Sequence, residues 1–113
     1  MVNKMIERVS DHISTLMLCE EAIRKQFEIS QEEIDSQSFD NCDPLMESQY
    51  ETVPGLIHKY ENRVLCLMTV ECAAYCRFCT RRRLVSDIEL GRISRCTVNN
   101  WASYLSEHDE VNE

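Results

Sequence analysis

The sequence predicts an α/β fold, in which N-terminal helices precede the first β/α unit of a larger, incomplete sheet. Three observations support this prediction. Apolar residues recur at spacings of three and four near the N-terminus, a nearly continuous apolar run occupies residues 63–70, and a cysteine-rich loop follows it. We divide the chain into an N-terminal helical region, residues 1–43, and the start of a second domain, residues 44–113.

The N-terminal region is expected to be helical. Residues 2–27 are predicted to form one helix, because their apolar side chains would lie on a single stripe. Ser30 followed by Glu33 fits a capping box that begins a short second helix. Residues 36–53 are polar and contain Pro44, which predicts a connecting segment.

The second region is expected to begin with a buried strand. The apolar run of residues 63–70 is typical of a strand buried on both faces in a parallel sheet. The cysteines would then lie at the C-terminal end of this strand, where α/β folds place their active sites. Pro54-Gly55 is a turn signal, Thr97 is predicted to cap a final helix, and acidic residues 107–113 are expected to fray.

Composition and charge exclude several classes of protein. The 113 residues are 43% hydrophobic and 28% charged, as in soluble globular domains. No apolar run approaches about 18 residues, and the N-terminus lacks a secretory signal, so we expect a cytoplasmic protein with no membrane partner. The net charge is −8, but residues 58–83 carry a balance of +4. One basic segment in an acidic chain indicates a local anion site rather than nucleic-acid binding.

Seven cysteines in a chain without a secretory signal indicate metal binding rather than disulfides. Three of them have the spacing C-x3-C-x2-C, with Phe78 just before the third: Cys72, Cys76 and Cys79. Three thiolates on one loop can converge on one iron–sulfur cluster and leave one of its irons open. The other four are interpreted as small buried apolar residues. They are Cys19, Cys42, Cys66 and Cys96.

Spacing alone leaves two other interpretations open. An iron–sulfur protein that only carries electrons would ordinarily use a fourth cysteine, for which Cys96 is a candidate. A structural zinc site also needs four ligands, and His58 or Cys66 could complete it. An isolated histidine such as His58 is, however, more often a hydrogen-bonded structural residue.

The residues around the cysteines resemble the lysine 2,3-aminomutase family of radical S-adenosylmethionine (SAM) enzymes. The similarity covers residues 43–83 and rests on three motifs. They are Pro54-Gly55-Leu56-Ile57-His58-Lys59-Tyr60, Arg63-Val64-Leu65 and Cys76-Arg77-Phe78-Cys79-Thr80-Arg81-Arg82-Arg83. The resemblance implies that the chain is the N-terminal portion of such an enzyme, and that residues 44–113 begin a partial TIM-type radical SAM barrel.

The resemblance also implies cofactors and an activity. Members of the family are isomerases that bind a [4Fe–4S] cluster, SAM and pyridoxal 5′-phosphate (PLP), and convert lysine to β-lysine by moving its α-amino group. The resemblance assigns three thiols to the cluster: Cys72, Cys76 and Cys79. It assigns three residues to the PLP phosphate: Lys59, Tyr60 and Arg63. Arg81 would hold the carboxylate of lysine or a lysine-like amino acid, and Arg82 and Arg83 would add only a positive field.

The sequence departs from the family pattern in two respects. Lys59 replaces the more usual arginine, which keeps the charge but loses bidentate geometry. The Ser-Gly-Gly-Asp-Pro motif that contacts SAM is absent, and no lysine follows Lys59 to link PLP. We therefore expect a truncated chain that is inactive alone, with a second polypeptide supplying the rest of the barrel. The alternatives are a non-catalytic iron–sulfur or zinc-binding fragment and an inert remnant that does not fold.

Overall fold

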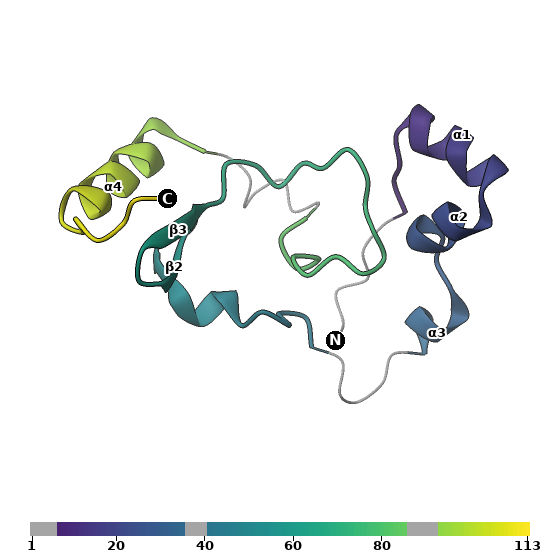
Figure 1. Cartoon of the computed structure of the whole chain (residues 1–113), viewed down its shortest axis with the longest axis horizontal. Helices are drawn as coiled ribbons and strands as arrows, with labels where there is room; N and C mark the ends of the chain where they lie inside the picture. Colours follow the sequence, from purple (N-terminus) through teal and green to yellow (C-terminus); the bar gives the residue numbers. More distant parts are fainter. Residues whose placement is uncertain (1–6, 36–40, 86–92) are drawn as a thin grey trace.

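The computed structural model describes residues 7–35, 41–85 and 93–113. In chain order the elements are α1 (Asp11–Cys19), α2 (Glu21–Phe27), α3 (Gln31–Ile34), the 3-10 helix η1 (Glu47–Tyr50), β1 (Glu51–Val53), β2 (Leu56–Tyr60), β3 (Arg63–Cys66) and α4 (Arg95–Ser106). The chain is therefore α/β, as predicted, with helices followed by a small sheet. Figure 1 shows α1–α3 on one side, the sheet and α4 on the other, and the cysteine loop between them.

The predicted single helix over residues 2–27 is wrong for the part that the structure describes. Val9 is extended and bridges Ala74, and α1 begins only after Ser10, whose Oγ accepts a hydrogen bond from the backbone N–H of Ile13 at 3.4 Å. The backbone is extended again at Glu20, between α1 and α2. A serine cap competes with helix continuation, and apolar periodicity alone does not detect it. Residues 1–6 lie outside the described residues.

The predicted connecting segment over residues 36–53 contains regular structure at its C-terminal end. Ser30 Oγ accepts from the N–H of Glu33 at 3.4 Å, which confirms the expected cap of α3. Residues 36–40 of the predicted connecting segment lie outside the described residues, and its end forms η1 and β1 instead of a loop. None of the described helices is long and apolar enough to cross a membrane.

The sheet is an antiparallel meander in the order β1-β2-β3. Gly55 has φ +78° in the predicted turn between β1 and β2, and Tyr60 pairs with Arg63 across the tight turn between β2 and β3. Each pairing closes a short loop, which has a small entropic cost. The predicted parallel strand over residues 63–70 is wrong, because β3 ends at Cys66 and pairs antiparallel with β2.

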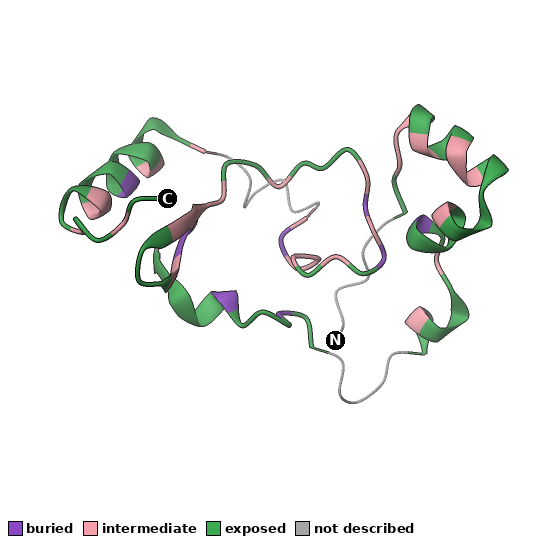
Figure 2. Cartoon of the chain, in the orientation of Figure 1, coloured by how far each residue is buried: buried purple, intermediate pink, exposed green. Residues whose placement is uncertain are grey.

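Helix α4 packs against the turn between β1 and β2. Trp101 is buried, and its Nε1 donates a hydrogen bond to the carbonyl of Pro54 at 2.8 Å. Leu56, which is fully buried, and Ile57 provide the apolar part of the hairpin. Figure 2 shows that buried residues are widely spaced along the part of the chain that the structure describes, and this corner is one of the small cores there.

The ends of α4 differ from the prediction in two ways. Ser94, rather than Thr97, is the N-cap, and Thr97 is its partner in the capping box. The predicted fraying of residues 107–113 is wrong, because the N–H of Asn112 donates to the carbonyl of Asn62 at 2.9 Å, and the N–H of Val64 donates to that of Glu113 at 3.1 Å. These bonds anchor the C-terminal residues to the hairpin.

The N-terminal helices are fastened to the cysteine loop by main-chain hydrogen bonds. The N–H of Tyr75 donates to the carbonyl of Arg8 at 3.0 Å, and that of Arg77 to the carbonyl of Gln26 at 2.8 Å. Phe27 and Tyr75 are both buried on this side of the loop. The loop therefore has the helices on one flank and the hairpin on the other (Figure 1).

Replacing Gly55 with alanine is expected to lower the free energy of unfolding by about 1–2 kcal/mol. An added Cβ would lie 3.0 Å from Cζ2 of Trp101, and the positive φ is unfavourable for any L side chain. Urea unfolding followed by the fluorescence of Trp101, the single tryptophan, measures the change. A Gly55→Ala variant with an unchanged midpoint would contradict the role assigned to this turn.

Candidate functional site

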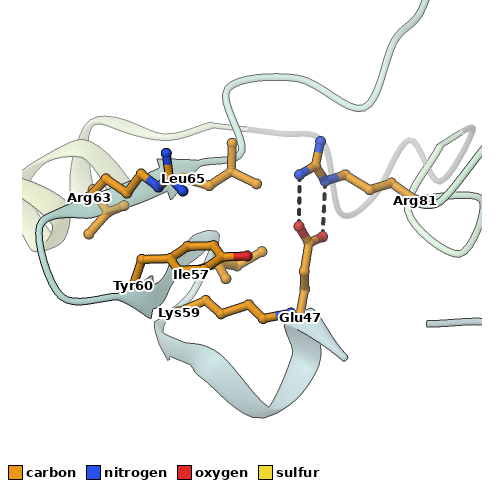
Figure 3. Close-up of a pocket in the computed structure, with 8 residues that line it drawn as sticks. Glu47, Ile57, Lys59, Tyr60, Arg63, Leu65 and Arg81 are labelled. Atoms are coloured by element: carbon orange, nitrogen blue, oxygen red, sulfur yellow. Dashed lines mark hydrogen bonds and ion pairs between the residues drawn. The ribbon is translucent and has the colours of Figure 1, made fainter. Parts of the chain in front are cut away.

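A cavity of about 230 Å³ lies on one face of the β2–β3 hairpin. Its lining residues are Glu47, Ile57, Lys59, Tyr60, Arg63, Val64, Leu65 and Arg81. Side chains two residues apart on a strand share a face, which brings Lys59 and Ile57 of β2 together with Arg63 and Leu65 of β3. The cavity thus gathers all four residues that the sequence motifs assigned to phosphate and carboxylate binding (Figure 3).

Two cations of the cavity are held by neighbouring groups. The Nζ of Lys59 donates to the carbonyl of Leu45 at 2.7 Å and lies 5.6 Å from the ring centroid of Tyr50. The guanidinium carbon of Arg63 lies 4.5 Å from the ring centroid of Tyr60, within cation–π range. These contacts restrict two long side chains that would otherwise lose considerable entropy on binding an anion.

Arg81 is held by a bidentate ion pair with Glu47. Its Nε and Nη2 lie 2.9 and 2.7 Å from the two carboxylate oxygens, and Figure 3 shows Glu47 pointing directly at the guanidinium. The side chain of Glu47 is 8% exposed, whereas that of Arg81 is 40% exposed. Hydrogen bonding to Glu47 raises the pKa of Arg81, so this cation keeps its charge throughout the physiological range.

Asp43 anchors the turn that carries Glu47. Its two carboxylate oxygens accept hydrogen bonds from the backbone N–H groups of Glu47, at 3.1 Å, and Ser48, at 2.8 Å. One oxygen also lies 3.6 Å from Nε of Arg83. Burial raises the pKa of Asp43, but the hydrogen bonds from Ser48 and Glu47 and the charge of Arg83 outweigh it and lower the pKa to about 2.

The acidic partners of the arginine-rich loop were not predicted from the sequence. Arg77 pairs with Glu33, with Nε 2.8 Å from one carboxylate oxygen, and Arg82 donates to the carbonyl of Arg77 at 2.9 Å. Asp43 and Glu47, four residues apart just before β1, hold the other end of the loop. The available signal was charge, since these acids precede the one basic segment of an acidic chain.

A second cavity, of about 250 Å³, adjoins the cysteine loop and has Cys72, Cys79 and Arg81 among its lining residues. Cys72 is exposed, Cys76 and Cys79 are half-buried, and the N–H of Cys79 donates to the carbonyl of Cys76 at 3.0 Å. Across the described ranges, no three His, Cys, Asp or Glu side chains are arranged to hold a metal ion. The donor chemistry, three free thiols on one loop of which two line this cavity, still fits the ligand set of an iron–sulfur cluster.

The other cysteines do not behave as predicted. Cys19, Cys42 and Cys96 are exposed and Cys66 is half-buried, so their interpretation as buried apolar residues is wrong. A small chain has few fully buried positions, and other side chains occupy them here. Burial raises the pKa of the Cys66 thiol, which makes it a poor thiolate donor for a metal.

His58 has the structural role that was expected of it. Its Nδ1 lies 2.8 Å from the hydroxyl of Tyr104 on α4, and its Nε2 lies 3.2 Å from the carbonyl of Glu61. The ring of His108 lies 5.6 Å from that of His58 and stacks on Tyr104 at 3.9 Å between ring centroids. Both nitrogens of His58 therefore have partners within the hairpin–α4 unit.

No family model matches the chain, but individual proteins do. The L-lysine 2,3-aminomutase of Bacillus subtilis (strain 168) is 37% identical over 91 residues, which are 80% of this chain and 19% of that protein. The enzyme of the same name from Fusobacterium nucleatum is 51% identical over 65 residues, 58% of this chain and 15% of that protein. That from Methanococcus maripaludis is 32% identical over 96 residues, 85% of this chain and 22% of that protein.

Over the segment that it shares with these proteins, the chain belongs to the lysine 2,3-aminomutase family. It spans about a fifth of the length of the curated aminomutases that it matches. A match over 80% of 113 residues necessarily includes the central part of the chain, in which the residues lining both cavities lie. The similarity to the aminomutases therefore includes the candidate site.

Asp43 is expected to make the stability of the chain depend on pH in the acid range. Its pKa falls from 3.8 to about 2 on folding, so the ionised carboxylate stabilises the fold above pH 4, and this contribution is lost between about pH 4 and pH 2. Asp43→Asn should lower the free energy of unfolding at pH 7 by about 2 kcal/mol and flatten its decrease below pH 4.

Urea unfolding at several pH values measures this effect. Asp109→Asn is the matched control, because Asp109 is exposed near the C-terminus and should leave the acid dependence unchanged. Equal acid dependence in the wild type and Asp43→Asn would show that Asp43 does not anchor the turn.

Proposed function

We propose that this chain supplies the cofactor-binding part of a lysine 2,3-aminomutase, a radical SAM isomerase that converts lysine to β-lysine. The observation that carries the proposal is that one cavity is lined by Lys59, Tyr60, Arg63 and Arg81, in a chain related to proteins of that name. In this proposal, residues 1–43 form a helical region and residues 44–113 begin a partial radical SAM barrel.

Lys59, Tyr60 and Arg63 would bind the phosphate of PLP. The cavity contains three cationic side chains and one carboxylate, a formal charge of +2 that matches a phosphate dianion. Tyr60 is 53% exposed and Arg63 is also exposed, so the donors of both side chains remain accessible to a ligand. Bound PLP would supply a carbonyl group for amino-group chemistry, and Arg81 would hold the carboxylate of lysine or a lysine-like amino acid.

Cys72, Cys76 and Cys79 would hold a [4Fe–4S] cluster whose open iron binds SAM, the source of the radical chemistry. Support comes from the donor set and from Arg81, which lines both the thiol cavity and the cation-lined cavity. Because one residue borders both cavities, a substrate held by Arg81 would lie beside the cluster. Such proximity between substrate and radical source is what a hydrogen abstraction requires.

We propose further that these 113 residues do not turn over lysine by themselves. No lysine follows Lys59 in the sequence, so a residue that links PLP would have to come from elsewhere. The chain also spans about a fifth of its relatives. The remaining part of the barrel would have to come from polypeptide outside these 113 residues.

Anaerobic reconstitution of the chain with iron and sulfide is expected to yield a [4Fe–4S] cluster whose electron paramagnetic resonance spectrum changes when SAM is added. Alanine variants of Cys72, Cys76 and Cys79 should each lose the cluster, whereas Cys96→Ala, on α4, should retain it. A spectrum that SAM does not change would mean that a fourth ligand closes the cluster. A colourless protein with one zinc would favour the alternative, a non-catalytic metal-binding fragment.

Arg63→Ala is expected to weaken PLP binding at least tenfold, because it removes a charge-assisted phosphate contact worth about 1.5–3 kcal/mol. Absorbance titration with PLP and with pyridoxal, which lacks the phosphate, separates phosphate recognition from reaction of the aldehyde. Arg95→Ala, an exposed position at the start of α4, is the control and should bind PLP like the wild type. Equal affinities for PLP and pyridoxal in the wild type would refute the phosphate site.

A further inference from the structure

Arg81 is bound along one edge and accessible along the other. We propose that Glu47 is a positioning residue, which holds the Nε–Nη2 edge of Arg81 so that the Nη1 end of the guanidinium is presented to a carboxylate ligand. This inference rests on the proposed function, in which Arg81 binds the substrate carboxylate. It adds a role for Glu47, a buried residue to which the sequence motifs assigned none.

The geometry of the ion pair determines which donors of Arg81 remain. A guanidinium has five N–H donors in one plane, and Glu47 accepts one from Nε and one from Nη2. Within the described part of the chain, no other residue accepts a hydrogen bond from Arg81. Two parallel bonds prevent the planar group from rotating, so the remaining donors at Nη1 and Nη2 have a fixed direction. Since the side chain is 40% exposed, a ligand can reach them.

Burial of Glu47 argues against the opposite role, in which it competes with the ligand for Arg81. The side chain of Glu47 is 8% exposed, and its backbone N–H is bonded to Asp43 at 3.1 Å. If a ligand displaced it, an unpaired carboxylate would remain buried in a segment that cannot easily move outward, which is strongly unfavourable. Glu47 therefore stays in place while the ligand binds the other edge.

Replacing Glu47 with glutamine distinguishes a positioning role of Glu47 from a purely electrostatic one, because the two roles predict opposite changes in carboxylate binding. Glu47→Gln raises the formal charge of the cavity from +2 to +3, which by itself would strengthen the binding of every anion. It also removes the bidentate contact that orients Arg81. Phosphate held by Lys59 and Arg63 should respond to the charge alone, whereas a carboxylate at Arg81 should respond to the lost orientation.

The test titrates the full chain with sodium acetate and, separately, with inorganic phosphate at constant ionic strength, and follows arginine side-chain N–H signals by NMR. In Glu47→Gln, acetate affinity should fall at least fivefold while phosphate affinity is unchanged or increased. Glu61→Gln is the matched control, because Glu61 is exposed between β2 and β3, and it should leave acetate affinity unchanged. Tighter acetate binding by Glu47→Gln would overturn the proposal.

A second measurement, made on the wild type and assigned with one further variant, decides the question if Glu47→Gln does not fold. The Nε–H signal of Arg81 is identified by its loss in Arg81→Lys. Acetate should shift the Nη signals of Arg81 while its Nε–H signal stays at the position of a carboxylate-bound group. Movement of the Nε–H signal toward that of free arginine would mean that acetate displaces Glu47, and no response of Arg81 would mean that it binds no carboxylate. Either result overturns the inference.

The two probes also separate this inference from the proposed function. If inorganic phosphate fails to shift Arg63 in the wild type, the PLP site of the proposed function is refuted. The response of Arg81 to acetate still decides the role of Glu47 in that case.

Discussion

Pairs of carboxylates and guanidinium groups connect the arginine-rich end of the cysteine loop to segments that precede it by more than thirty residues. Glu47 binds Arg81, Asp43 binds Arg83, and a separate pair joins the loop to α3. Residues 67–85 contain turns and one isolated bridge but no helix or strand, so regular backbone pairing does not fix their path. Because several of these charges are buried, losing one partner would leave the other unsatisfied, which makes the loop geometry depend on all of them.

The same pairs determine the chemistry that the site can offer. Glu47 lowers the positive charge of the cavity without filling it, and the hairpin contributes Lys59 and Arg63 from adjacent strands. Few apolar residues of the described ranges are buried; among them Leu56 and Trp101 lie where the hairpin meets α4, and Phe27 and Tyr75 lie beside the other flank of the loop. Electrostatic pairing thus connects the segments that carry these two groups.

Turn and capping residues in the sequence correctly predicted those features that depend only on neighbouring residues. The turn at Gly55 and the cap at Ser30 follow from backbone conformation and short-range hydrogen bonding. The four cavity residues were assigned by the resemblance to the aminomutase family, and their motifs lie on one hairpin and the adjoining loop. The apolar run after Arg63 was misassigned, since a short run of this kind is compatible with a parallel strand and with a hairpin. The turn before it contains no glycine to reveal the hairpin.

Longer-range features could not be predicted in this way. The contact between Glu47 and Arg81 joins residues 34 positions apart, and no local pattern of residues distinguishes such a pair from two solvated charges. The position of α4 is similar, because it depends on Trp101 reaching the carbonyl of Pro54, 47 residues away. Both contacts follow from the tertiary arrangement and not from propensity.

The hydrogen bonds between the C-terminal residues and the hairpin have a consequence for self-association. In the sheet order β1-β2-β3, strand β3 lies at an edge, and an uncovered edge can pair with strands of other molecules. The main chain at Asn112 and Glu113 bonds to Asn62 and Val64 along that margin. Asn112 and Glu113 therefore cover part of the β3 edge. Removing these two residues would leave that edge free to pair with strands of other molecules.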